Sequence, residues 1–149
     1  MIMAVAGSRY MSEYGREVIN KLLTANYPPR RAGELQIKKF EVVTIKVMGC
    51  NSEVIRKCQE LHLECKIFEG NNFEKLNEDM ANYADFLVIV EGGKKSGTLL
   101  LASKFVEKNK NVYCVPGRIT DEGSWGNNWL IKQGAMPLIE VGDLTEVLQ

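Results

Sequence analysis

A glycine- and lysine-rich turn stands in the second half of the chain, within the stretch VEGGKKSGTLLLASKF at residues 90–105. Its two adjacent glycines can take positive φ angles and let the backbone approach a ligand closely. The Ser-Gly-Thr that follows stands where a helix would begin, and the free N–H groups and dipole of a helix N-terminus favour an anion. The two lysines add positive charge. This pattern predicts a phosphate-bearing ligand held by Gly92, Gly93, Lys94, Lys95, Ser96, Gly97 and Thr98.

A second turn, GSRY at residues 7–10, closes the first apolar run of the chain. Gly7 and Ser8 begin it, and the guanidinium of Arg9 can hold a phosphate through two parallel hydrogen bonds. The lysine-rich turn is not a Walker A loop, because no glycine directly precedes a Lys-Ser pair at the required spacing, and it is not a G-x-G-x-x-G turn. The predicted chemistry is therefore anion binding through two cationic turns.

A third candidate segment is VPGRITDEGSWGNNWLIKQGA at residues 115–135, which follows the fifth predicted strand. Its candidate ligand contacts are Gly117, Arg118 and Asn128. Trp125 and Trp129 are open to two interpretations. They can be anchors in the hydrophobic core, or Trp125, together with Tyr10, can offer a ring on which nucleic acid bases stack.

Apolar runs and amphipathic stretches alternate along the whole sequence. Helices are predicted from Ser12, from Ser52 and over residues 73–83, 99–106 and 125–132, and strands over residues 2–6, 40–48, 63–68, 85–90, 111–115 and 136–141. Pro137 confines the last strand to an edge or to its own first residues. Residues 28–31 are expected to form a mobile loop. The alternation predicts a three-layer, Rossmann-like α/β fold with a doubly wound, mostly parallel sheet, in a single domain of residues 1–149.

In such a sheet the first and fourth strands lie side by side, and ligands bind beyond their carboxyl ends. The turn at residues 7–10 follows the first strand, and the lysine-rich turn follows the fourth. We therefore expect the two turns to meet and to form one cationic site.

Composition and the remaining polar residues argue against several other functions. The 149 residues carry 19 basic and 19 acidic side chains, so nucleic acid binding would have to rest on a local patch. The four cysteines lack paired zinc spacing, and the only histidine, His62, falls at the end of a predicted helix, away from the turns. Glu91, Asp121 and Glu122 have the generic spacing of solvated loop carboxylates. We predict no catalytic residue, no metal, no cofactor and no membrane segment, and expect a reduced, cytoplasmic protein.

Three segments resemble the DprA/Smf family of DNA-processing proteins. They are AVAGSRYMSEYGREV, ADFLVIVEGGKKSGTLLLASKFVEKNKNVYCVPGRI and GNNWLIKQGAMPLI. The resemblance is strong over residues 84–139 and moderate over residues 4–18. It implies a Rossmann-like fold that binds single-stranded DNA, forms a homodimer and helps to load a RecA-type recombinase. It also implies DNA contacts from Arg9, Lys94, Lys95, Ser96 and Gly97.

The chain departs from the family pattern at two places. Where the family has Arg-Asn-Arg before the central strand, this sequence has Leu76, Asn77 and Glu78, so only the asparagine remains as a candidate contact. Where the family has a Ser-Gly-x-Ala-x-Gly-Ile-Asp turn after its second strand, the sequence reads MGCNSE. Each lost phosphate contact should weaken binding and flatten its dependence on salt.

Three hypotheses about function follow. The first is a DprA-like module that binds single-stranded DNA, and the second is a site for a nucleotide or nucleotide-derived small ligand. The third, a nucleotide phosphoribohydrolase, is disfavoured because Leu101 stands where that family has its catalytic glutamate. An apolar side chain cannot act as an acid or a base.

Overall fold

The structure is a computed structural model that describes residues 1–25 and 40–148. The loop expected at residues 28–31 lies outside the described residues. In chain order the elements are β1 Ile2–Ala6, α1 Glu13–Ala25, β2 Glu41–Ile45, α2 Cys50–Leu61, β3 Cys65–Phe68, α3 Phe73–Tyr83, β4 Phe86–Ile89, α4 Thr98–Glu107, β5 Val112–Cys114, a 3₁₀ turn Glu122–Ser124, α5 Trp125–Lys132, β6 Met136–Pro137 and α6 Asp143–Leu148.

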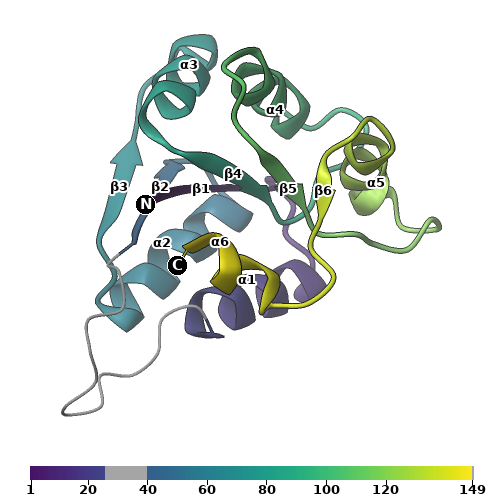
Figure 1. The fold of residues 1–149 in the computed structure, drawn as a ribbon, viewed down its shortest axis with the longest axis horizontal. Helices are drawn as coiled ribbons and strands as arrows, with labels where there is room; N and C mark the ends of the chain where they lie inside the picture. Colours follow the sequence, from purple (N-terminus) through teal and green to yellow (C-terminus); the bar gives the residue numbers. More distant parts are fainter. Residues whose placement is uncertain (26–39, 149) are drawn as a thin grey trace.

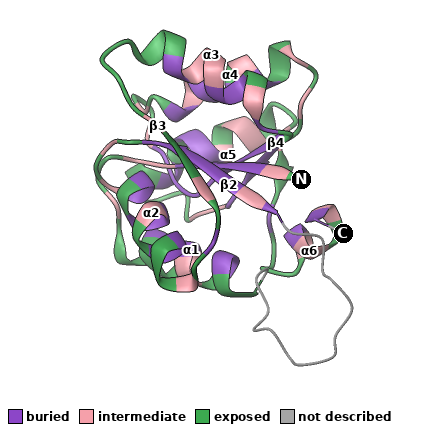
Figure 2. Ribbon diagram, turned by 90° about the vertical axis from the view of Figure 1, so that its left-hand side faces the viewer, coloured by how far each residue is buried: buried purple, intermediate pink, exposed green. Residues whose placement is uncertain are grey.

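The strands form one six-stranded sheet in the order β3-β2-β1-β4-β5-β6, and every neighbouring pair is parallel. The predicted doubly wound α/β fold is confirmed. Helices α1, α2 and α6 cover one face of the sheet, and α3, α4 and α5 cover the other (Figure 1). Burial follows the same three layers, with the central strands β1, β2, β4 and β5 enclosed between the two sets of helices (Figure 2).

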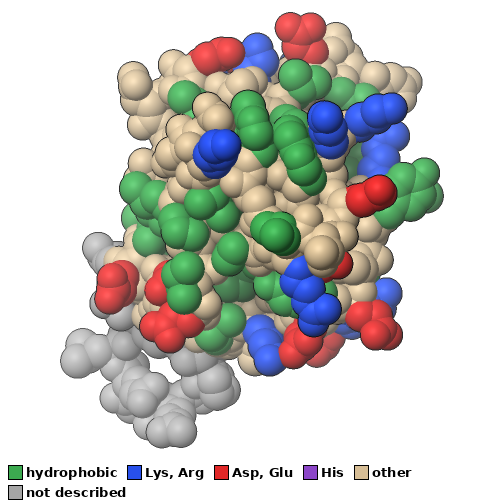
Figure 3. All heavy atoms as spheres, turned by 90° about the vertical axis from the view of Figure 1, so that its right-hand side faces the viewer, with side chains coloured by type: hydrophobic (Ala, Val, Ile, Leu, Met, Phe, Trp, Pro, Cys, Tyr) green, Lys and Arg blue, Asp and Glu red, His purple; other side chains and the backbone are tan. Residues whose placement is uncertain are grey.

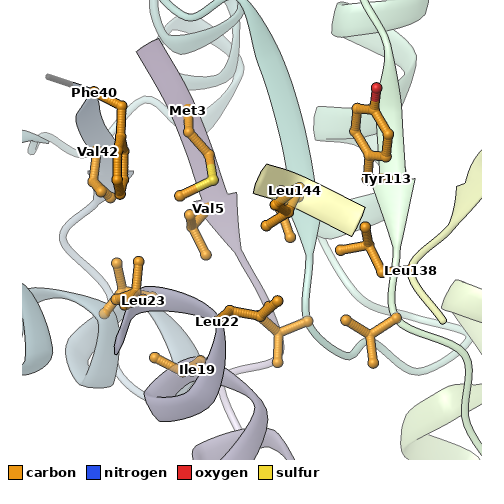
Figure 4. Packing of buried hydrophobic residues seen from close by; sticks show 14 of the residues in the cluster. Met3, Val5, Ile19, Leu22, Leu23, Phe40, Val42, Tyr113, Leu138 and Leu144 are labelled. Carbon is orange, nitrogen blue, oxygen red and sulfur yellow. The ribbon is translucent and has the colours of Figure 1, made fainter. Parts of the chain in front are cut away.

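Successive side chains of β1 point to opposite faces of the sheet, so the hydrophobic core has two halves, one on each face. Met3 and Val5 point toward α1 and α2, whereas Ala4 and Ala6 point toward α3 and α4. On the first side, Leu22 of α1 and Leu144 of α6 belong to the same buried cluster as Met3 and Val5 (Figure 4). Because β1 and β4 are buried on both faces, they read as continuous apolar runs in the sequence.

The last strand is shorter than predicted. A strand was expected over residues 136–141, but β6 contains only Met136 and Pro137. The chain turns away because the N–H groups of Ile139 and Glu140 both donate to the carboxylate of Asp143, at 2.7 and 3.0 Å, and α6 begins at Asp143. β6 pairs only with β5 and forms the sheet edge, as the proline requires.

Other element boundaries differ by a few residues. β2 covers Glu41–Ile45 rather than residues 40–48, and α2 begins at Cys50 rather than near Ser52. Within residues 1–25 and 40–148, no helix is long and apolar enough to cross a membrane.

Candidate phosphate-binding site

The two cationic turns meet at the carboxyl ends of the strands, as predicted. β1 pairs directly with β4, and the N–H of Ser8 donates to the carbonyl of Glu91 at 2.8 Å. Between the turns lies an open hollow of about 570 Å³. Its lining comprises Ala6, Gly7, Ser8, Arg9, Tyr10, Ile45, Val47, Asn51, Phe73, Asn77, Gly93, Lys95, Ser96, Gly97, Thr98, Leu100 and Leu101.

A buried carboxylate holds the first turn in place. Glu91 is only 6% exposed, and it accepts hydrogen bonds from the N–H and the hydroxyl of Ser12, at 2.7 and 2.6 Å. The same hydroxyl accepts from the N–H of Gly15 at 3.0 Å, so Ser12 caps α1 as predicted. Position 15 requires glycine, because a Cβ there would overlap the Glu91 carboxylate. Glu91 is therefore a structural clamp between β4 and α1, which sequence reasoning missed.

Helix α2 supports the same turn from the other side. The side chain of Asn51 accepts from the N–H of Gly7 at 3.1 Å and donates to the carbonyl of Ile45 at 3.1 Å. The N–H of Cys50 donates to the carbonyl of Ser8 at 2.9 Å. Burial, with the nearby Glu91 carboxylate, raises the pKa of the Cys50 thiol to about 12, so this cysteine is not an activated nucleophile.

The glycines of the second turn serve close packing rather than unusual backbone angles. Gly92 and Gly93 could take positive φ angles, but neither does. A Cβ on Gly92 would lie 2.5 Å from Oγ1 of Thr98, and one on Gly93 would lie 3.3 Å from the carbonyl of Glu122. The absence of a side chain lets the turn fold tightly onto its neighbours.

The start of α4 forms one wall of the hollow. Gly97 is the N-cap, and Ser96 accepts hydrogen bonds from the N–H and the hydroxyl of Thr98, at 3.3 and 3.0 Å. Thr98 is buried and its hydroxyl proton is already donated, so it supports the turn. An anion in the hollow would face the amino end of α4, where the helix dipole is favourable.

The hollow is electropositive. Arg9 and Lys95 are exposed and line it, and no Asp or Glu is among its described lining residues. The guanidinium of Arg9 lies over the ring of Phe73, 5.2 Å from its centroid. Lys94 instead lies over the ring of Trp125, at 5.4 Å. The two adjacent lysines therefore serve different surfaces of the same turn.

Helix α3 contributes polar and apolar lining but no cation. Asn77 lines the hollow as expected, and Leu76 beside it is buried in the core. Glu78 forms ion pairs with Lys104 and Lys108, which join α3 to the end of α4. Where the family has two arginines, this chain thus has Leu76, which packs in the core, and Glu78, which forms ion pairs that link α3 to the end of α4.

The candidates from the third segment do not line the hollow. Asn128 accepts from the N–H of Gly117 at 3.1 Å and donates to its carbonyl at 2.9 Å, so both ends of its amide fix the loop. Arg118, like Gly117, is absent from the lining. Asn127 is fully buried, and its side-chain NH₂ donates to the carbonyls of Ile89 in β4, of Val90 just after β4 and of Val115 just after β5. It ties α5 to the centre of the sheet.

The residues that could serve other chemistry lie buried or away from the hollow. No group of three or more His, Cys, Asp and Glu is arranged to hold a metal ion within residues 1–25 and 40–148. Leu101 is buried in the core below the hollow, and His62 caps the carboxyl end of α2. Burial raises the pKa of Cys114 to about 12.

The fold and the hollow together define a Rossmann-like α/β protein with a cationic site at the switch point of its sheet. The chain belongs to the DNA recombination-mediator protein A family, whose sequence model matches residues 43–149, more than half of its length. The resemblance inferred from the sequence is confirmed.

Two curated relatives match about half of the chain. Protein Smf of Escherichia coli (strain K12) is 36% identical over 78 residues, which are 52% of this chain and 21% of that protein. DNA processing protein DprA of Bacillus subtilis (strain 168) is 31% identical over 77 residues, 52% of this chain and 26% of that protein. The matched part of the chain thus spans about a quarter or less of the length of these relatives.

Two solved structures share the fold over nearly the whole chain. The X-ray structure of DprA from Streptococcus pneumoniae has a TM-score of 0.81 at 17% identity, covering 97% of this chain and 60% of that one. DNA processing protein A from Helicobacter pylori, in a study of its single-stranded DNA binding mode, has a TM-score of 0.75 at 15% identity, covering 99% and 80%. At these identities the likeness concerns the fold.

Proposed function

We propose that this chain binds single-stranded DNA, with the phosphate backbone lying over the turns at residues 7–10 and 92–98. The observation that carries the proposal is the meeting of Arg9 and Lys95 around one hollow that has no described carboxylate in its lining. A cationic groove that follows the backbone is what sequence-independent binding of single strands requires.

Membership of the DNA recombination-mediator protein A family supports this ligand over other anions. The Helicobacter pylori relative, which shares the fold, was studied for its mode of binding single-stranded DNA. Because identity to that protein is 15%, the individual contacts in this chain are argued from its own residues.

The decisive experiment is a titration of a fluorescein-labelled oligo(dT), followed by anisotropy at about 50 mM and about 200 mM salt. Each phosphate neutralised on a single strand contributes about −0.7 to the slope of log K against log salt. Arg9, Lys94 and Lys95 together predict a slope of about −2, and so a 15- to 20-fold weaker affinity at the higher salt. The variants Arg9→Ala and Lys95→Ala should each reduce the slope to about −1.4.

Lys21→Ala is the matched control. Lys21 is also an exposed lysine, but it lies on α1 and pairs with Glu17 at 2.7 Å, outside the lining of the hollow. Its removal should leave both the affinity and the salt slope unchanged. Absence of binding at both salts, or equal losses in Lys21→Ala and Arg9→Ala, would contradict the proposal.

A small nucleotide is the second candidate ligand, and the size of the hollow is the observation that favours it. About 570 Å³ falls within the range of small-molecule pockets, roughly 300–1,000 Å³. A nucleoside monophosphate that raises the melting temperature, with no binding of oligo(dT), would select this ligand, since a ligand that binds only the folded state stabilises it. Homodimer formation and contact with a RecA-type recombinase stay predictions.

A further inference from the structure

The two tryptophans of the chain form a stacked pair on the surface. Trp125 and Trp129 stand four residues apart on α5, with ring centroids 6.0 Å apart and planes inclined by 11°. Their exposed fractions are 40% and 41%, so they are not the core anchors considered from the sequence. Because the two rings are adjacent, they form one contiguous exposed aromatic surface, and contiguous exposed apolar surface is typical of binding sites.

The tryptophan pair has a positive charge beside it, which lies over the ring of Trp125. The ammonium of Lys94 lies 5.4 Å from the centroid of the Trp125 ring, within the range of a cation–π contact. The face of the molecule that bears α5 and β6 shows hydrophobic side chains gathered beside Lys and Arg side chains (Figure 3). An aromatic surface with an adjacent cation suits a ligand that has flat rings and negative charge.

The pair is also fixed to the proposed phosphate site. The N–H of Gly126 donates to the carbonyl of Gly92 at 2.8 Å, and the N–H of Gly92 donates to the carbonyl of Gly123 at 2.9 Å. A Cβ on Gly126 would lie 2.7 Å from the Gly92 carbonyl, so the close approach of α5 to the turn requires glycine. Since Lys94 faces Trp125 and Lys95 lines the hollow, the two surfaces are one residue apart along the turn.

We propose that Trp125 and Trp129, with Lys94 beside them, form a platform on which bases of a bound single strand stack. The inference rests on the proposed function, because the same strand would place its phosphates over Arg9 and Lys95. Bases of a single strand expose their flat faces, whereas those of a duplex are covered by their neighbours, so the occupant is single-stranded. Stacking is tolerant of sequence because every base has such a face.

The first measurement is intrinsic fluorescence. Because the chain has only these two tryptophans, all tryptophan emission reports on the platform. Titration with unlabelled oligo(dT) should quench the emission over the same concentrations that raise the anisotropy of the labelled strand. Quenching should persist at low salt in Lys21→Ala, which keeps the platform intact.

The second measurement separates stacking from charge. Trp125→Ala should weaken binding about tenfold while leaving the salt slope unchanged, whereas Lys94→Ala should reduce the slope by about 0.7. Trp125→Phe, which keeps an aromatic face, should recover most of the affinity. Val106→Ala, which trims an apolar side chain that is 63% exposed on α4, should bind like the parent chain.

The outcomes distinguish this inference from the proposed function. If oligo(dT) binds with the expected salt slope but tryptophan emission is unchanged and Trp125→Ala binds normally, the platform is wrong and the phosphate site stands. If the strand does not bind at either salt, both fall. Emission that changes with protein concentration in the absence of DNA, together with dimer formation that Trp125→Ala abolishes, would assign the pair to an interface between copies and overturn the platform.

Discussion

Replacing Gly15 by alanine is expected to reverse the usual effect of this substitution. In the interior of a helix, Gly→Ala normally stabilises a protein by about 1 kcal/mol. Gly15 lies in the first turn of α1, and a Cβ there would overlap the Glu91 carboxylate, which must then move. Glu91 would lose its hydrogen bonds to the N–H and hydroxyl of Ser12, now 2.7 and 2.6 Å long.

The magnitude follows from those two hydrogen bonds. A hydrogen bond to a charged group contributes about 1.5–3 kcal/mol, so losing both costs about 3–6 kcal/mol. Subtracting a helical gain of about 1 kcal/mol leaves a net destabilisation of about 2–5 kcal/mol. For a chain of this size that corresponds to a melting temperature lower by roughly 4–20 °C.

The assay is urea unfolding followed by far-UV circular dichroism, performed as a double-mutant cycle. In a Glu91→Ala background the obstacle is absent, so Gly15→Ala should be neutral or stabilising there. A Gly15→Ala protein at least as stable as the parent would refute the clamp. So would an equal loss of stability in both backgrounds.

Three further changes test other parts of the structure. Cys65 should react first with a thiol reagent in the native protein, because it is partly exposed and a hydrogen bond from the Cys58 thiol lowers its pKa, whereas burial raises the pKa of Cys50. Mass spectrometry of the alkylated sites measures the order of reaction. A hydrogen bond from Arg56 lowers the pKa of Glu53 in the folded protein. The ionised Glu53 therefore stabilises the fold above the ordinary glutamate pKa, and this contribution is lost as pH falls through the lowered pKa of the folded state. Glu53→Gln should reduce the loss of stability at acid pH, measured by urea unfolding. Gly92→Ala should lower the free energy of unfolding by about 1–3 kcal/mol, because the new Cβ would overlap the hydroxyl of Thr98. Gly97→Ala, which has open space around it, should lower the free energy of unfolding by less, as measured by urea unfolding.

The meeting of the two cationic turns could be predicted from the sequence because parallel topology dictates it. A short apolar run at residues 2–6 and a continuous apolar run at residues 85–90 indicate strands buried on both faces. In a doubly wound sheet these strands are neighbours, so the turns after them lie together whatever their side chains. The register of Ala6 opposite Ile89 brings both strands to the same edge.

The supports of the turns could not be predicted, because they depend on contacts between residues far apart in the chain. Glu91 looks like a solvated loop carboxylate until Ser12 and Gly15, more than seventy positions earlier, are placed against it. Asn127 and Asn128 are adjacent in sequence, and only the packing of α5 decides which is buried in the sheet and which fixes the loop. Helix α6 is six residues long, too short to show a helical period.

The loss of cations from α3 changes the kind of binding that the site requires. With a buried leucine at position 76 and Glu78 in an ion pair, the positive charge among the described lining residues of the hollow comes from Arg9 and Lys95 on the two turns. Interactions of a few exposed charges weaken steeply as salt rises, whereas stacking of bases on aromatic rings does not depend on counterion release. A site with few phosphate contacts therefore needs aromatic surface to hold a strand at physiological salt. The exposed stacked rings of Trp125 and Trp129 supply that surface next to Lys94, and on this reasoning they should matter more as salt increases.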